Sequence, residues 1–187
     1  LGRPLSTLMR DGPAEDLNVT TNTQPAMLAA DVALWRAWLA AGGPQPAMVG
    51  GHSLGEYAAL VAAGAVDFAS AMRLVAARAQ AMQAEYALTR AQVHQALGQI
   101  AEAAAELADF AKLYAGQPTV PAALLLQVQL AVAQQDWPAA QTMCRALGEA
   151  FAGQSEEPQA WLAVGAGALA TGQRDVARTA LTFVETN

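Results

Sequence analysis

A repeating pattern with a step of 37 residues runs through the second half of the chain and constrains its fold more than any other feature. Gly98, Gln135 and Gly172 stand one step apart. A common period of about 20–50 residues is typical of stacked supersecondary units. The pattern predicts three helical hairpins over residues 84–187, each with a turn at the Gly or Gln and a second helix that packs through a small residue. The other positions that share the step are Ala103, Ala140 and Ala177; Leu107, Cys144 and Leu181; Phe110, Leu147 and Val184; and Ala87, Leu124 and Trp161.

The order of large residue, turn, alanine and large residue in this half resembles the tetratricopeptide repeats. The resemblance covers about residues 84–187 and implies an all-α array of helical hairpins. Such arrays present a concave face, so a peptide or another protein is the partner that the resemblance implies for this half.

The first half of the chain has a different pattern. A short apolar segment at 47–52 precedes Ser53, and an apolar stretch that ends at Gly64 follows it. We expect a strand at 47–52, a tight turn at Ser53 and a helix over 54–63. Residues 1–83 carry five Arg and six acidic residues, whereas residues 84–187 carry five basic and ten acidic residues. Two modules, 1–83 and 84–187, follow from these differences.

The predicted fold class is therefore mostly α. It combines a fragment of an α/β core, which contains the turn at Ser53, with an all-α array of helical hairpins. Upstream of the turn, Asn22 or Thr23 can cap a helix that has Pro25 in its first turn.

Five residues around the predicted turn form the sequence G-x-S-x-G, which is the pattern of a nucleophile elbow. They are Gly51, His52, Ser53, Leu54 and Gly55. A serine at a strand-to-helix turn needs small residues on both sides, because bulk at either glycine would collide with neighbouring backbone. The following helix directs its amide hydrogens toward the place where an oxyanion forms. We predict a nucleophilic Ser53 rather than an incidental serine.

Longer stretches resemble the malonyl-CoA:acyl-carrier-protein transacylases of fatty acid biosynthesis and the related acyltransferase domains of polyketide synthases. The resemblance covers about residues 1–83. It rests on the runs 23–26, 51–60 and 73–75, together with Arg78 and Met82.

This resemblance implies an acyltransferase in which Ser53 accepts a malonyl group from malonyl-CoA and passes it to the phosphopantetheine thiol of an acyl carrier protein. It also implies that the Leu54 amide is one oxyanion donor and that Gln24 lies near the site. Neither a metal ion nor a bound organic cofactor is expected, because malonyl-CoA is a substrate.

Arg78 is a candidate substrate-binding residue. At helical spacing it falls on the same face as Ala71 and Val75, and a buried arginine needs an anionic partner. The resemblance gives this position the role of binding the free carboxylate of the malonyl group, which suits the planar guanidinium. The alternatives are an arginine that extends from the helix edge to solvent or one that pairs with a structural acid.

The sequence does not supply an obvious catalytic base. His52 adjoins Ser53 but points to the opposite side of an extended chain, and His94 falls on a predicted helix in the repeat region. The transacylases draw their histidine from later in the chain, and their N-terminal oxyanion loop has no match before Leu17. We therefore expect impaired acyl transfer.

Three interpretations of residues 1–83 remain open. The first is an incomplete domain, the second is a domain completed by another polypeptide, and the third is one of two unrelated sequences joined near residues 83–85. In the rival hypothesis, the chain is a helical-repeat interaction module with an inactive acyltransferase remnant.

Composition narrows the possible partners and location. The net charge is −6, with 10 basic and 16 acidic residues, which argues against nucleic acid. No apolar run approaches the roughly 20 residues that span a bilayer. The single cysteine, Cys144, fits a reducing compartment. We expect a cytoplasmic protein that does not bind membranes.

Overall fold

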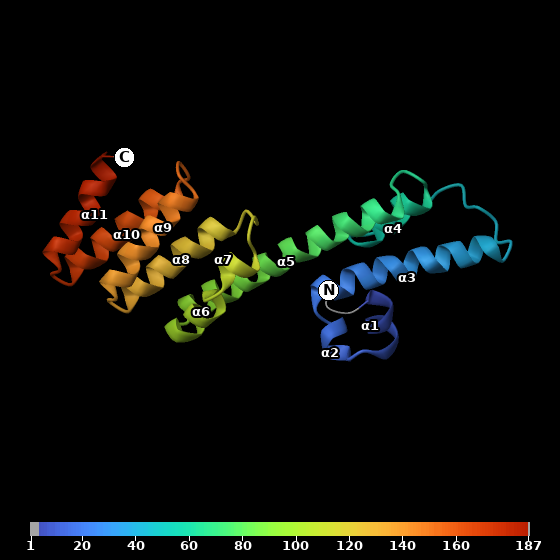
Figure 1. Ribbon diagram of the computed structural model, residues 1–187, viewed down its shortest axis with the longest axis horizontal. Coiled ribbons are helices and arrows are strands. Elements are labelled where there is room, and N and C mark those ends of the chain that lie inside the picture. Colours follow the sequence, from blue (N-terminus) through green and yellow to red (C-terminus); the bar gives the residue numbers. More distant parts are fainter. Residues whose placement is uncertain (1–3, 187) are drawn as a thin grey trace. The chain divides into compact units, whose positions relative to one another are not determined.

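The computed structural model describes residues 4–186, and every regular element within that range is an α-helix (Figure 1). The chain divides into two compact units, Leu1–Gln83 and Ala84–Asn187. Residues 1–3 and 187, at the ends of the two predicted modules, lie outside the described residues. None of the described helices is both long and apolar enough to cross a membrane.

The first unit is built from the helices that precede residue 84. Leu28 and Val32 of α3 pack with Leu54, which precedes α4, and with Ala71 and Val75 of α5 in one buried cluster. Burial of these side chains fixes the start of α4 against the two long helices. The helices are α1 (Leu5–Asp11), α2 (Ala14–Leu17), α3 (Thr20–Ala40), α4 (Gly55–Ala62) and the first part of α5 (Phe68–Ala96).

The strand expected at 47–52 is absent, so the prediction of an α/β fragment is wrong in its β part. The segment is irregular, and no strand occurs anywhere in residues 4–186. A β-strand is stabilised by hydrogen bonds to a neighbouring strand. The part of the chain that the structure describes offers no such neighbour. Met48 and Val49 of this segment are exposed instead of covered by a helical layer.

Helix α3 begins earlier than its sequence predicts. It starts at Thr20 rather than after Asn22 or Thr23, and Pro25 lies inside it. The hydroxyl of Thr23 donates hydrogen bonds to the carbonyl oxygens of Leu17 and Val19, which joins the start of α3 to the end of α2. These local bonds support the extra turn before the proline.

The start of α5 is capped by a carboxylate. Asp67 Oδ1 accepts a hydrogen bond of 2.9 Å from the Ser70 amide, and Asp67 Oδ2 accepts one from the Ser70 hydroxyl. The Ser70 hydrogen bonds lower the pKa of Asp67, and the nearby positive charge of Arg73 lowers it further. An acid in this place satisfies amide groups that have no partner inside the helix.

The second unit consists of the end of α5 and the helices after it. Helix α8 packs against α9 and α10, and α10 also packs against α11, so neighbouring helices lie side by side along the chain (Figure 1). The side chains between them form continuous buried clusters. The helices are α6 (Ile100–Leu107), α7 (Phe110–Leu113), α8 (Val120–Ala133), α9 (Trp137–Ala150), α10 (Glu156–Ala170) and α11 (Arg174–Thr186).

The turn residues that are separated by 37 positions share one backbone conformation. Gly98, Gln135 and Gly172 have φ values of 74°, 57° and 77°, and each follows a long helix. The alanines in the first turns of the next helices, Ala103, Ala140 and Ala177, are all buried. Small side chains there let the two helices of each turn approach closely.

One set of large residues in the pattern is buried at its first two positions and exposed at its third. Leu107 and Cys144 are fully buried, whereas Leu181 is 42% exposed. Burial and the nearby carboxylate of Glu157, opposed by the charge of Arg145, together raise the pKa of the Cys144 thiol to about 12. Cys144 therefore serves packing rather than thiolate chemistry.

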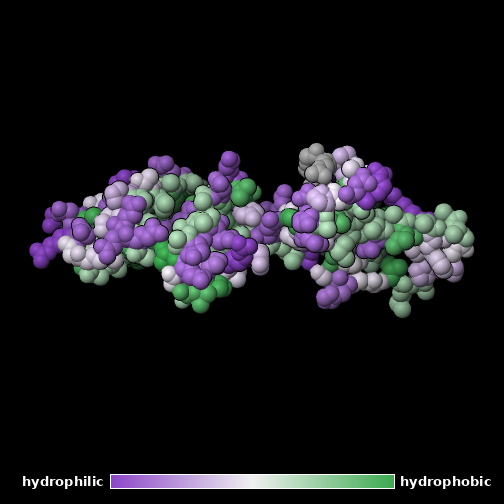
Figure 2. Space-filling model, turned by 90° about the horizontal axis from the view of Figure 1, so that it is seen from below, coloured by the Kyte–Doolittle hydropathy of each residue, from purple (hydrophilic) through white to green (hydrophobic). Residues whose placement is uncertain are grey.

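Large apolar side chains also lie on the surface of the first unit. Its surface in Figure 2, at the right of the view, carries green apolar residues among the purple polar ones. The most exposed of them are Leu34, Trp38, Met48, Leu74 and Met27.

Gln135 adopts a left-handed conformation that costs a non-glycine residue about 1–2 kcal/mol. We expect Gln135→Gly to raise the unfolding free energy by about 1 kcal/mol, because the relief of strain exceeds the added chain entropy of the unfolded state. The change is measured as a shift in the urea midpoint of the second unit.

The matched control is Gly172→Gln, because a Cβ at Gly172 meets no atom within 4 Å and only the backbone conformation is penalised. This variant should lose stability by a similar amount. Equal midpoints for all three proteins would contradict the assigned backbone strain.

Candidate active site

Ser53 lies at a strained turn at the start of α4. Its φ of 57° is in the left-handed region, which a non-glycine residue adopts only where the surroundings enforce it. The side chain of the next residue, Leu54, is buried in the core of the first unit, while Ser53 is exposed. Burial of Leu54 thus holds the Ser53 hydroxyl outward at the beginning of the helix.

The two glycines beside the turn have different surroundings. A Cβ added at Gly51 would overlap the carbonyl group of Gly55, whereas one added at Gly55 would meet no atom within 4 Å. The expectation that both positions exclude side chains therefore holds for Gly51 and is wrong for Gly55. Gly51 is required because its backbone passes directly against the first turn of α4.

Three of the residues singled out from the sequence lie together. Arg78 Nη2 donates a hydrogen bond of 2.7 Å to Ser53 Oγ, and Arg78 Nη1 donates one to Gln24 Oε1. The residues come from three different places in the first unit: the turn before α4, the middle of α5 and the first part of α3. The fold thus brings Ser53, Arg78 and Gln24 into one cluster.

Gln24 is itself held in place by further contacts. Only 7% of the residue is exposed, and its Nε2 donates a hydrogen bond of 2.9 Å to Thr20 Oγ1 and one of 3.4 Å to Met82 Sδ. These bonds orient the amide so that Oε1 faces Arg78. Thr20 was not predicted from the sequence, although residues four apart on a helix share a face and Thr20 precedes Gln24 by that interval.

The charge of Arg78 has no acidic partner in the part of the chain that the structure describes. Both of its acceptors are neutral oxygens, and no carboxylate of residues 4–186 lies within 4.0 Å of its guanidinium. The side chain is half-buried on the helix face that also carries the buried Ala71 and Val75. A partly desolvated guanidinium with neutral partners has the capacity to bind an added anion.

The amide of Leu54 is a second group that can receive negative charge. Within residues 4–186 it has no hydrogen-bond acceptor, whereas the Gly55 amide donates to His52 O at 3.0 Å and the Glu56 amide to Ser53 O at 3.3 Å. Leu54 directly precedes the eight-residue helix α4, whose amino-terminal end carries a partial positive charge.

Neither histidine of the chain hydrogen-bonds to the serine. His52 is exposed, and His94 Nδ1 lies 2.7 Å from Gln99 Oε1 in the second unit. Of the side chains that the structure describes, only Arg78 hydrogen-bonds to Ser53 Oγ. Since a guanidinium stays protonated, it stabilises an alkoxide but does not accept the serine proton.

Parts of this chain are similar to known proteins. A family model described as acyl transferase domain matches residues 2–124. The chain belongs to the acyl transferase domain family. The part matched to the acyl transferase model extends beyond Gln83, the last residue of the first unit, and ends in the second unit.

Curated relatives of the chain include bacterial malonyl CoA-acyl carrier protein transacylases. The protein of Escherichia coli strain K12 is 59% identical over 83 residues, which are 44% of this chain and 27% of the relative. That of Salmonella typhimurium is 58% identical over 83 residues, which again are 44% of this chain and 27% of the relative. That of Bacillus subtilis is 39% identical over 105 residues, 56% of this chain and 33% of the relative.

Solved structures give a similar coverage. The acyl-carrier-protein S-malonyltransferase of Burkholderia pseudomallei is 63% identical, covers 44% of this chain and is matched over 27% of its own length, with a TM-score of 0.43. The chain spans about a quarter to a third of the length of the curated relatives that it matches.

The unequal surroundings of Gly51 and Gly55 give a matched pair of variants. We expect Gly51→Ala to destabilise the turn by about 1–3 kcal/mol, because its methyl group would displace backbone atoms. Gly55→Ala should leave the turn unchanged or slightly more stable, because alanine favours a helix. Hydrogen exchange of the amides of residues 52–62 measures both effects, and equal exchange in the two variants would contradict the difference in space.

Proposed function

We propose that the first unit carries out acyl transfer through an acyl-serine at Ser53, with malonyl-CoA as the donor and an acyl carrier protein as the acceptor. The observation that carries the proposal is the hydrogen bond between Ser53 Oγ and Arg78, an arginine with no acidic partner among residues 4–186. Malonyl transacylases of bacteria are close relatives over 44% of the chain, which supports this donor and acceptor.

The proposed first step forms one bond and breaks another. Ser53 Oγ attacks the thioester carbonyl carbon, the carbon–sulfur bond breaks, and coenzyme A leaves as the thiol with the serine proton. The Leu54 amide stabilises the negative oxygen of the tetrahedral intermediate. A second thiol, that of the carrier protein, reverses these steps and regenerates the serine. No bound cofactor or metal takes part in this scheme.

Arg78 is proposed to bind the free carboxylate of the malonyl group. Before the reaction its Nη1 bonds to Gln24 and its Nη2 to Ser53. After acylation the serine oxygen is an ester oxygen and a poorer acceptor, so Nη2 turns to the carboxylate while Gln24 keeps the other side of the guanidinium in place. The resulting charge-assisted hydrogen bond favours malonyl over uncharged acyl groups.

The proposal includes slow turnover. Serine becomes a good nucleophile only when a base takes its proton, and no histidine of residues 4–186 bonds to Ser53.

Incubation with malonyl-CoA followed by intact-mass analysis tests the acyl-serine. We expect a malonyl adduct on the unaltered chain and none on Ser53→Ala, because only the hydroxyl forms the ester. Well-folded protein without any adduct after long incubation would exclude acylation by this chain alone.

The role of Arg78 is tested by substrate preference. With Arg78→Ala, the ratio of malonyl to acetyl labelling should fall by about tenfold or more, because only malonyl presents a carboxylate and a charged hydrogen bond contributes about 1.5–3 kcal/mol. Arg73→Ala is the control, since Arg73 is exposed and bonds to Ser70 on the same helix. An unchanged ratio in Arg78→Ala would remove this residue from substrate binding.

A second candidate function is a helical-repeat interaction module with an inactive acyltransferase remnant. We infer a tetratricopeptide-like array over residues 84–187 from the common step of 37 residues and from the positive φ shared by Gly98, Gln135 and Gly172. In this case a peptide or protein is the partner, and the labelling experiment gives no adduct on folded protein.

A further inference from the structure

We propose that Thr20 is a positioning residue for the malonyl group: its hydroxyl fixes the amide of Gln24, and this amide keeps the guanidinium of Arg78 where the acyl carboxylate binds. This role rests on the proposed acyl transfer through Ser53 and assigns part of its selectivity to a further residue. Thr20 acts through its neighbours and not by a hydrogen bond to the serine, whose partner among the described side chains is Arg78.

The first turn of α3 supplies Thr20. The helix begins at Thr20, and the preceding residue, Val19, provides no side-chain cap. A hydrogen bond from the Thr23 hydroxyl to the carbonyl oxygen of Leu17 holds this turn to the end of α2 instead. The hydroxyl of Thr20 is therefore available to Gln24, which lies one turn further on the same face of the helix.

Gln24 uses both ends of its amide inside the cluster. Its Nε2 donates a hydrogen bond of 2.9 Å to Thr20 Oγ1 and one of 3.4 Å to Met82 Sδ, and its Oε1 accepts one from Arg78 Nη1. Only 7% of Gln24 is exposed, so an amide hydrogen that loses its acceptor here finds little water to replace it. Removal of the Thr20 hydroxyl would thus leave a buried N–H group unpaired.

The two ends of the Gln24 amide are not interchangeable. The guanidinium of Arg78 only donates hydrogen bonds, and the thioether sulfur of Met82 only accepts them. An amide turned by half a rotation would place its N–H groups against the guanidinium and its oxygen against the sulfur. Arg78 and Met82 therefore set the direction of the amide. Thr20 fixes its position, because its hydroxyl forms the shorter of the two bonds of Nε2.

The position of the amide matters because Arg78 has few other supports. Its second hydrogen bond goes to Ser53 Oγ, and in the proposed reaction that bond is given up when the serine is acylated. Gln24 is then the partner that still holds the guanidinium. A guanidinium held in advance binds a carboxylate without first losing the freedom of its side chain. Without Gln24 in place, the long side chain of Arg78 can extend from the helix edge into water.

The ratio of malonyl to acetyl labelling tests this role. Thr20→Val keeps the branched shape of the side chain and removes the hydroxyl, and we expect the ratio to fall by about fivefold, the effect of one neutral hydrogen bond. Thr20→Ser retains the hydroxyl and should retain the ratio of the unaltered chain. A purely structural role would lower labelling by both acyl donors alike and leave their ratio unchanged. Thr20→Ala is a second variant without the hydroxyl and carries the same expectation, since alanine favours the helix.

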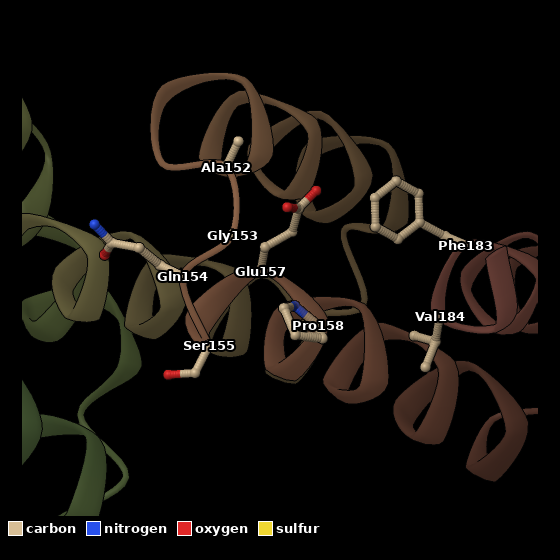
Figure 3. Close-up of a pocket in the computed structure, with 8 residues that line it drawn as sticks. All are labelled: Ala152, Gly153, Gln154, Ser155, Glu157, Pro158, Phe183 and Val184. Atoms are coloured by element: carbon tan, nitrogen blue, oxygen red, sulfur yellow. The ribbon is translucent and has the colours of Figure 1, made fainter. Parts of the chain in front are cut away.

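Two controls separate Thr20 from other hydroxyl groups. Thr21→Val makes the same change one residue further along α3, and Thr21 is not among the described hydrogen-bond partners of Gln24. A hollow of about 510 Å³ in the second unit is an alternative place for malonate (Figure 3). The carboxylate of Glu157 in its lining disfavours an anion. Ser155→Ala removes a hydroxyl from the same lining, and both controls should leave the ratio unchanged.

Malonate binding distinguishes the failure of this role from the failure of acyl transfer, because it needs no reaction at Ser53. The full chain is titrated with malonate and followed by the NMR signals of the Gln24 side-chain amide and of Arg78 Nε. Thr20→Val should shift the amide signals and weaken malonate binding by about fivefold, whereas Thr21→Val should do neither.

Each outcome has a definite meaning. This pattern of malonate binding without any labelling would overturn acyl transfer and support the positioning role. An unchanged malonate affinity in Thr20→Val, an unchanged labelling ratio where labelling occurs, or an equal loss in Thr20→Ser would overturn the role of the hydroxyl. Malonate that does not bind the unaltered chain would overturn both.

Discussion

The hydrogen bonds of Arg78 connect the parts of the first unit on which any chemistry depends. The guanidinium extends from α5 to Gln24 of α3 on one side and to Ser53 before α4 on the other. Each of the three residues is placed by a different constraint. Gln24 is oriented by Thr20, Ser53 is held outward by the buried Leu54, and Arg78 starts from the packed face of α5. The cluster forms only when these helices are packed together.

The cluster of Ser53, Arg78 and Gln24 contains groups that bind negative charge but no group that accepts the serine proton. It has a hydroxyl, a cation without an acidic partner among residues 4–186 and an amide without an acceptor in the same range. Each of these groups binds or stabilises negative charge. A group that removes the proton of Ser53 is absent from the described side chains around it. The cluster is thus better suited to binding an anion than to deprotonating the serine.

Local sequence signals predicted much of this structure. The helix expected over 54–63 is observed as α4, and the turns expected at Gly98, Gln135 and Gly172 are present between helices. The grouping of Ser53 with Gln24 and Arg78 followed from the family resemblance rather than from spacing alone, because the three residues are distant in sequence. Thr20 was missed, although its position four residues before Gln24 carried a sufficient signal.

The errors have a common physical origin. The segment 47–52 has the apolar character of a strand, but a strand depends on a partner elsewhere in the chain, and local sequence does not reveal whether that partner exists. Likewise, the free space around Gly55 depends on what packs there, whereas the close approach at Gly51 is local to the turn. The strand and the surroundings of Gly55 both depend on packing partners elsewhere in the chain, which the local sequence does not specify.

The left-handed backbone of Ser53 also limits which residues evolution can place there. Threonine carries an equally reactive hydroxyl, but its branched β-carbon crowds the main chain in this conformation, and β-branched residues are genuine outliers there. Replacement of serine by threonine, which is conservative on most protein surfaces, would here destabilise the turn itself. The choice of alcohol at position 53 is therefore dictated by the shape of the main chain as much as by reactivity.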